Sequence, residues 1–290
     1  MLQLSDTQKA IVETVREFVT KEVIPVADEM EHDDEFPDAI VEQMKELGLF
    51  GLTVPEEYGG IGESLTAYAL AVVELARGWM SLSGVLNTHF MGCYLINKFG
   101  TDDQRQKFLP KMATGEWRAA LAMSEPEAGS DVQAIRTKAV KDGDDYIVNG
   151  SKMWLTNGLR SSLVMTLVKT DLSSEPPHRG ISMLIVEKEG GNPAPAPGLD
   201  VGKNIEKMGY KGVETTEMTF NDYRLPKTSL LGTEEGHGFR QVLDGIEVGR
   251  VNVAARAVGL STRAFEEAIR YSQERKAFGK AISQHQAVQI

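Results

Sequence analysis

The 290-residue sequence contains one cysteine, Cys93, which excludes an intramolecular disulfide and any site built from several thiolates. No apolar run is long enough to cross a bilayer, and the first six residues lack the basic and apolar regions of a secretory signal. The formal net charge of −11 argues against nucleic acid as the main partner, because binding phosphates requires a basic surface. Together these absences predict a cytoplasmic globular protein without a membrane span.

The usual nucleotide and metal motifs are also absent. No G-x-G-x-x-G follows a predicted strand, and no G-x-x-x-x-G-K-[ST] occurs. The five histidines are scattered and do not form a metal-ligand pair at helical spacing, so we expect no metal site. Ser130 and Asp131 are adjacent, but no histidine can be identified as a partner for a hydrolase triad.

Helical patterns fill roughly the first 115 residues. Ser5 with Gln8, and Thr101 with Gln104, have the spacing of capping boxes, and Pro25 is expected to end the first helix. Further helices are predicted from near Pro37 to Gly48, from about Thr66 to Gly78, and up to Gly100.

The pattern changes at Trp117 to short β-type runs separated by turn residues. Runs are predicted at residues 118–123, 146–148, 163–168, 181–186 and 217–220. The sequence Asp-Gly-Asp at 142–144 predicts a hairpin turn, and the proline-rich residues 190–198 predict a loop.

Helix returns at Gly238. A long apolar stripe is predicted to contain Phe239, Val242, Ile246, Val253, Ala257, Ala264 and Ala268. A further helix begins at residues 282–290 without a stop signal, and two helices rarely bury their apolar faces alone, so we expect a truncated chain or one that depends on partner chains. The fold class is therefore α+β multidomain, with an N-terminal all-α bundle (1–117), a middle β-barrel or sandwich (118–232) and the first part of a C-terminal helical domain (233–290).

Three segments could carry chemistry. Residues 123–131 (MSEPEAGSD) offer backbone N–H groups and serine hydroxyls to a ligand, although the motif taken alone favours a plain polar turn. Residues 152–158 (KMWLTNG) place an indole beside a hydroxyl, as a flat ring would require, but also fit a core tryptophan followed by a turn. Residues 275–280 (RKAFGK) could bind a pyrophosphate through Arg275, or could simply provide cations at a helix C-terminus.

These segments, in this order and over the whole chain, resemble the acyl-CoA dehydrogenase family. Residues 54–60 (VPEEYGG) and the stretch 99–110 also fit the family. The resemblance implies a start of a C-terminal four-helix bundle, the cofactor FAD and a homo-oligomer, usually a tetramer. It also implies that electrons pass to an electron-transferring flavoprotein.

The site residues follow from the same resemblance. It implies that FAD is bound by Leu121, Met123, Ser124, Gly129, Ser130, Trp154 and Thr156, with Thr156 near flavin N5. It implies that Arg275, Phe278, His285 and Gln286 contribute to flavin binding, with Arg275, Phe278 and Gln286 reaching the FAD of a neighbouring subunit. It implies that Ser130, Glu247 and Arg250 touch the CoA part of the substrate.

The implied reaction is dehydrogenation of an acyl-CoA thioester to the trans-2-enoyl-CoA, in which a glutamate removes the α-proton. Some relatives carry this base at the position of Gly249, and glycine cannot act as a base. Glu247 would point about 200° around the helix from position 249, so we expect the glutamate beyond Ile290 and an inactive or severely impaired chain. A second departure from the family is Val213, where a serine is more common.

Two alternatives remain on the same fold. The first is a flavin monooxygenase or oxidase that keeps the FAD contacts, and the second is an inert acyl-CoA-binding relative. The first alternative would lack the C-terminal glutamate of a dehydrogenase. The second would give a colourless purified protein, because retained flavin is yellow.

Overall fold

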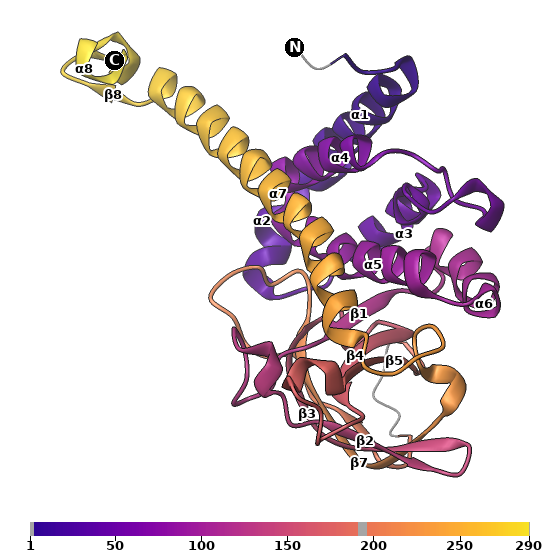
Figure 1. Ribbon diagram of the computed structural model, residues 1–290. Coiled ribbons are helices and arrows are strands. Elements are labelled where there is room, and N and C mark those ends of the chain that lie inside the picture. The colour runs from indigo at the N-terminus through magenta and orange to yellow at the C-terminus, as the bar shows by residue number, and fades with distance from the viewer. Residues whose placement is uncertain (1–2, 191–195, 290) are drawn as a thin grey trace.

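The computed structural model describes residues 3–190 and 196–289. Helices form the first part of the chain, a sheet follows, and one long helix leads away from the sheet to the C-terminal segment (Figure 1). The α-helices are α1 (Asp6–Phe18), α2 (Ile24–Asp33), α3 (Asp38–Glu46), α4 (Leu65–Gly78), α5 (Met80–Phe99), α6 (Asp102–Ala113), α7 (Gly238–Glu274) and α8 (Gln286–Gln289). None of these helices is both long enough and apolar enough to cross a membrane.

The predicted capping boxes are confirmed. The Ser5 hydroxyl accepts from the Gln8 backbone N–H while the Gln8 side chain accepts from the Ser5 backbone, and Thr101 with Gln104 repeats this exchange at the start of α6. Each box satisfies backbone N–H groups that the first helical turn leaves without partners. Gln104 also donates to the carbonyls of Thr228 and Leu230, so the second cap ties α6 to the end of the sheet.

The prediction that Pro25 ends the first helix is wrong. A π-helical turn (Val19–Val23) follows α1, and Pro25 lies in the first turn of α2. Proline is tolerated there because the first-turn N–H groups need no partner within the helix. The helical path therefore continues to Asp33.

The middle of the chain forms one sheet of seven strands in the described residues. The strands are β1 (Ala119–Ala122), β2 (Lys138–Asp142), β3 (Asp145–Thr156), β4 (Leu163–Lys169), β5 (Ile181–Glu187), β6 (Leu199–Val201) and β7 (Thr215–Pro226). Their order is β1-β4-β2-β3-β7-β6, with β5 paired to β4 on the side of the path. The predicted hairpin is confirmed, because Asp142 pairs with Asp145 and Gly143 has a φ of 63°.

Helix α5 packs against both the sheet and α7, and the start of α7 also contacts β5. A Cβ at Gly92 would stand 2.4 Å from the Cβ of Ala119 in β1, so the helix and the strand approach as closely as a glycine allows. Buried apolar side chains of α5, α6, β1, β4 and β5 share one core, and those of α1, α3, α4 and α5 share another.

The predicted apolar stripe of α7 is wrong beyond Ile246. Val253 and Ala257 are exposed, and the buried face instead carries Gly245, Gly249, Asn252, Ala255 and Gly259. Small residues occupy this face because α4 and α5 cross α7 at short distance, as the close contacts of Gly259 with Val73 and Ala76 demonstrate.

The segment after α7 forms a small unit at the outer end of that helix (Figure 1). Strands β8 (Lys276–Ala277) and β9 (Lys280–Ala281) pair, and α8 follows them. Part of the predicted proline-rich loop, residues 191–195, lies outside the described residues. The boundaries 1–117, 118–232 and 233–290 stay a prediction.

Candidate functional site

The first two segments predicted to carry chemistry lie side by side. The Met153 backbone N–H donates to the Ser124 carbonyl at 2.9 Å, and Lys152 Nζ donates to the Met123 carbonyl at 3.2 Å. These bonds hold the loop after β1 against the end of β3. The serine-bearing loop and the tryptophan-bearing strand therefore form one wall.

A buried ion pair fixes this wall. Lys152 is fully buried, and its Nζ lies 2.8 Å from Glu125 Oε1. Glu125 also accepts from the backbone N–H groups of Arg136 (2.6 Å) and Thr137 (2.9 Å). Burial lowers the pKa of Lys152 to about 8, and the facing carboxylate opposes that shift. Burial would raise the pKa of Glu125, but Lys152 and the N–H donors outweigh it and hold that pKa below its ordinary value.

Trp154 combines strain with exposure. Its φ is 66°, in the left-handed region that bulky residues avoid, and the pairing of β3 with β7 shifts register between Lys152 and Leu155. Its side chain remains 57% exposed. A strained backbone that turns a large aromatic ring outward is typical of a ligand site, because folding alone would bury that ring.

The neighbouring predicted residues are partly accessible. Thr156 is half-buried and pairs with Thr215 of β7. It follows Trp154 by two positions along the chain. Leu121, Met123 and Ser124 are also half-buried. A Cβ added at Gly129 would meet nothing within 4 Å, and Ser130 is exposed, so the outer part of the loop is open. Apolar, hydroxyl and backbone N–H groups around an exposed indole suit a heteroaromatic ring with a charged tail.

Asn157 joins this wall to α5, a role that the sequence analysis missed. Its Nδ2 donates to the Val85 carbonyl at 3.0 Å and to Thr88 Oγ1 at 2.8 Å. Thr88 Oγ1 in turn donates to the Ala119 carbonyl at 3.0 Å. The Asn-Gly pair was interpreted only as a turn, and sequence spacing gives no signal for its partner helix.

The residues predicted on α7 divide between two faces. Gly249 is buried, and a Cβ there would stand 2.6 Å from Met91 Sδ on α5. Glu247 and Arg250 are exposed, and neither forms an ion pair with any residue of 3–190 or 196–289. A purely intrahelical ion pair therefore does not explain these two side chains.

The third segment lies far from the first two. Arg275, Phe278 and Gln286 are exposed, Phe278 at 95%, and His285 is half-buried with its ring 5.9 Å from that of Phe278. Arg275 follows Glu247 by 28 positions, a rise of about 40 Å along α7 at 1.5 Å per residue. The structure does not bring this group to the Trp154 wall within one chain (Figure 1).

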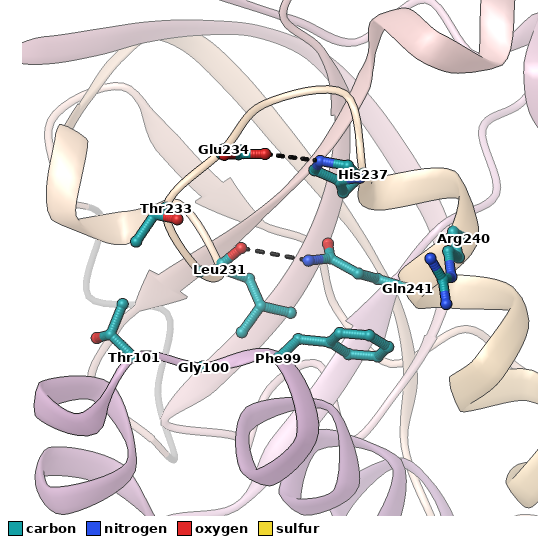
Figure 2. Close-up of a pocket in the computed structure, with 10 residues that line it drawn as sticks. Phe99, Gly100, Thr101, Leu231, Thr233, Glu234, His237, Arg240 and Gln241 are labelled. Atoms are coloured by element: carbon teal, nitrogen blue, oxygen red, sulfur yellow. Dashed lines mark hydrogen bonds and ion pairs between the residues drawn. The ribbon is translucent and has the colours of Figure 1, made fainter.

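A cavity of about 370 Å³ lies apart from all predicted site residues. It is bounded by the end of α5, the cap of α6, the loop 231–237 and the start of α7 (Figure 2). His237 pairs with Glu234 at 3.2 Å, and Gln241 donates to the Leu231 carbonyl at 3.3 Å across it. Among the described residues, no group of three His, Cys, Asp or Glu side chains could hold a metal ion.

Three family descriptions match consecutive parts of the chain. The acyl-CoA dehydrogenase N-terminal domain matches residues 5–116, the middle domain matches 120–223, and the C-terminal domain matches 236–290.

Curated relatives match over nearly the whole chain. A (2S)-methylsuccinyl-CoA dehydrogenase of Cereibacter sphaeroides is 39% identical over 96% of this chain and 51% of its own length. An acyl-CoA dehydrogenase of Bacillus subtilis is 36% identical over 99% of this chain and 74% of its own length. The chain thus spans about half the length of the first relative and about three quarters of the second.

Solved structures match equally well. A glutaryl-coenzyme A dehydrogenase in complex with glutaryl-CoA gives a TM-score of 0.92 at 34% identity, covering 99% of this chain and 71% of that one. A chain from a structure of the electron transferring flavoprotein of Acidaminococcus fermentans gives 0.91 at 36% identity, covering 100% of this chain and 74% of that one.

Proposed function

Because the chain belongs to the acyl-CoA dehydrogenase family, we propose that it binds FAD and an acyl-CoA thioester and forms the trans-2-enoyl-CoA by α,β-dehydrogenation. The observation that carries the proposal is the strained, exposed Trp154 held against the serine-bearing loop. When bound, FAD would supply the acceptor for a hydride from the β-carbon of the acyl group. The proposed domains are a helical domain at residues 1–117, a sheet domain at 118–232 and a helical domain from residue 233.

The residues of the Trp154 wall would hold the FAD. Leu121 and Met123 offer apolar contact, Trp154 and Thr156 flank the ring, and the open loop of Ser124, Gly129 and Ser130 offers hydroxyl and N–H donors to the pyrophosphate. The buried ion pair of Lys152 and Glu125 would position both segments from inside the fold. Ser130, Glu247 and Arg250 are proposed to bind the CoA part of the substrate, since the exposed Arg250 lies on α7 without an acidic partner in the described residues.

We place no catalytic base among the residues of this site. Gly249 faces Met91 and has no side chain to accept a proton, and Glu247 points to the opposite side of α7. The α-proton is therefore assigned to a glutamate outside residues 1–290. Hydrogen bonds to the thioester carbonyl would stabilise the developing enolate.

The proposal includes two kinds of partner. Arg275, Phe278, His285 and Gln286 are exposed or half-exposed at the far end of α7, about 40 Å from Glu247, so they would contact the FAD of a neighbouring subunit in a homotetramer. Electrons would leave through an electron-transferring flavoprotein.

Replacing Trp154 by glycine tests the FAD site apart from the fold. Glycine relieves the left-handed backbone, so the flavin-free variant should be at least as stable as the original protein. Loss of ring stacking should weaken FAD binding by about 1.5–3 kcal/mol, roughly 10-fold to 150-fold. Flavin fluorescence titration and thermal unfolding measure the two effects. Leu172→Ala removes another exposed apolar side chain and should leave FAD affinity unchanged; equal FAD affinity in both variants would refute the assignment.

The reaction is tested anaerobically. Acyl-CoA added to the flavin-loaded full-length protein should bleach the flavin absorbance, and the enoyl-CoA should be recovered. If residues 1–290 alone bleach at the same rate, the assignment of the base is wrong.

A further inference from the structure

Arg256 is a partly buried cation without an anion. Its Nη1 donates to Tyr210 Oη at 3.0 Å and its Nη2 donates to Asn252 Oδ1 at 2.8 Å, and both acceptors are neutral. Its Nε is buried and has no hydrogen-bond acceptor. No carboxylate of residues 3–190 or 196–289 lies within 4 Å of the guanidinium. Charges withdrawn from water normally have an opposite charge beside them, so this arrangement is incomplete.

Tyr210 adds a second unused donor. Its hydroxyl accepts from Arg256 and donates to no residue of the described chain. Burial raises the pKa of Tyr210, so the hydroxyl keeps its proton at neutral pH. A Cβ at Gly84 would lie 1.6 Å from Tyr210 Oη, so the absence of a side chain on α5 is what admits this ring. Tyr210 itself has a φ of 64°, an unfavourable conformation for a bulky residue.

The cluster of Arg256, Tyr210 and Asn252 lies along the interface of α5 and α7, to which the end of the Trp154 strand is also bonded. Asn252 Nδ2 donates to the Ser83 carbonyl of α5 at 3.1 Å, while Gly249 packs on Met91 of the same helix. Arg256 follows Gly249 by seven residues, two turns along the same face of α7 and a rise of about 10 Å. The end of the Trp154 strand meets α5 between these points, where Asn157 bonds Val85 and Thr88.

Glu31, an acidic side chain that contacts the loop of Tyr210, already has hydrogen-bond donors. Glu31 accepts from Trp79 Nε1 at 2.8 Å, from Ser81 Oγ at 3.2 Å and from the backbone N–H of Lys211 at 3.0 Å. Its oxygens face those donors and form no ion pair with Arg256. The anion that Arg256 lacks is therefore expected to come from a ligand.

We propose that Arg256 and Tyr210 bind a carboxylate at the far end of the acyl group, so that the substrate is a CoA monothioester of a short dicarboxylic acid. A guanidinium supported by a hydroxyl donor suits a carboxylate and disfavours a terminal methyl group, which would leave both donors unpaired. The proposal rests on the acyl-CoA function above. The similarity to dehydrogenases named for methylsuccinyl-CoA and glutaryl-CoA, both of this chemical class, agrees with it.

The experiment compares ligands of equal carbon number that differ only at the far end. Succinyl-, glutaryl- and adipyl-CoA are matched with butyryl-, pentanoyl- and hexanoyl-CoA. Dissociation constants are measured by calorimetry on the flavin-loaded full-length protein after reduction with dithionite, which prevents turnover. The variants are Arg256→Gln, Arg256→Lys and Tyr210→Phe, and the control is Arg270→Gln, an exposed arginine of the same helix that pairs with Glu267.

At least one dicarboxylic thioester should bind at least 10-fold more tightly than its methyl-ended match. Arg256→Gln should abolish this preference, which is a change of roughly 10-fold or more in the ratio of the two constants. Arg256→Lys should keep most of the preference, Tyr210→Phe should reduce it several-fold, and Arg270→Gln should leave it unchanged. Each variant is judged by the ratio of its dissociation constants for the two matched ligands. A general loss of folded protein affects both constants equally and does not change this ratio.

Two outcomes overturn the inference alone: a preference for the methyl-ended series, or an Arg256→Gln variant that weakens both series equally, as a packing role would. If neither series binds, the acyl-CoA function itself fails, and the inference fails with it.

Discussion

At the scale of single residues, the candidate site depends on one charge in the interior. Lys152 has no solvent exposure, and its ammonium group holds Glu125 and the Met123 carbonyl together. Breaking such a pair is costly because the remaining partner stays buried without compensation, whereas removing both partners is tolerated. The position of the serine-bearing loop is therefore sensitive to a residue that need not touch a ligand.

Lys152→Met should lower the free energy of unfolding by about 3–5 kcal/mol and release bound flavin, because Glu125 would remain buried and unpaired. The double variant Lys152→Met/Glu125→Gln should recover most of that stability, because a neutral amide oxygen still accepts from the backbone N–H groups of Arg136 and Thr137. Lys227→Met removes a lysine from an exposed pair with Asp144 and should change stability by less than about 1 kcal/mol. Urea unfolding measures all three. Equal losses in the single and double variants would contradict the role given to the pair.

At the scale of elements, local signals predicted where most helices begin and end. The side-chain caps at Ser5 and Thr101 were predictable because a cap involves residues three apart. The buried face of α7 was not predictable from apolar periodicity, since Gly245, Gly249 and Gly259 are buried by close helix crossing and not by their own hydrophobicity. Large apolar residues such as Val253 then remain on the outside.

The candidate site, like the helices, was predictable only where the signal is local in the sequence. The segments at 123–131 and 152–158 were identified as candidates from their residue types and their resemblance to a family. Their contact through Met153 and Ser124 required the fold. The cluster of Arg256 and Tyr210 carried no sequence signal, because 46 residues and several elements separate the two side chains.

Two glycines of α7 differ in whether their neighbours can move to admit a side chain. A Cβ at Gly259 would stand 2.2 Å from the Val73 carbonyl oxygen, a backbone atom that cannot move without shifting α4. A Cβ at Gly245 would stand 3.2 Å from a Leu95 methyl group, which can rotate away. Gly259→Ala should therefore destabilise the protein by about 1–3 kcal/mol. Gly245→Ala should change stability by less than about 1 kcal/mol, because alanine's helix propensity offsets the crowding. Thermal unfolding compares them, and a larger loss for Gly245→Ala would refute this picture of the crossing.

At the scale of the whole molecule, the two groups of proposed flavin contacts cannot serve one cofactor within one chain. Trp154 and its neighbours lie on the sheet, whereas Arg275 and Phe278 lie at the outer end of α7 (Figure 1). The helix between Glu247 and Arg275 spans about 40 Å, far more than a side chain can bridge. A symmetric oligomer would solve this by pairing the sheet wall of one subunit with the helix end of another.

Co-expression of two defective variants tests this arrangement. Trp154→Gly damages the sheet wall and Arg275→Gln damages the helix end, so each variant alone should retain little flavin. If each site combines two subunits, a mixed pair contains one site in which both contributing halves are intact. Random pairing of equal amounts should then restore about one site in four. The flavin-to-protein absorbance ratio of the purified mixture measures the restoration, and mixing the separately purified variants without subunit exchange is the control. A co-expressed mixture that holds no more flavin than the average of the two variants would place both halves in a single chain, and the 40 Å separation would then require a different path for α7.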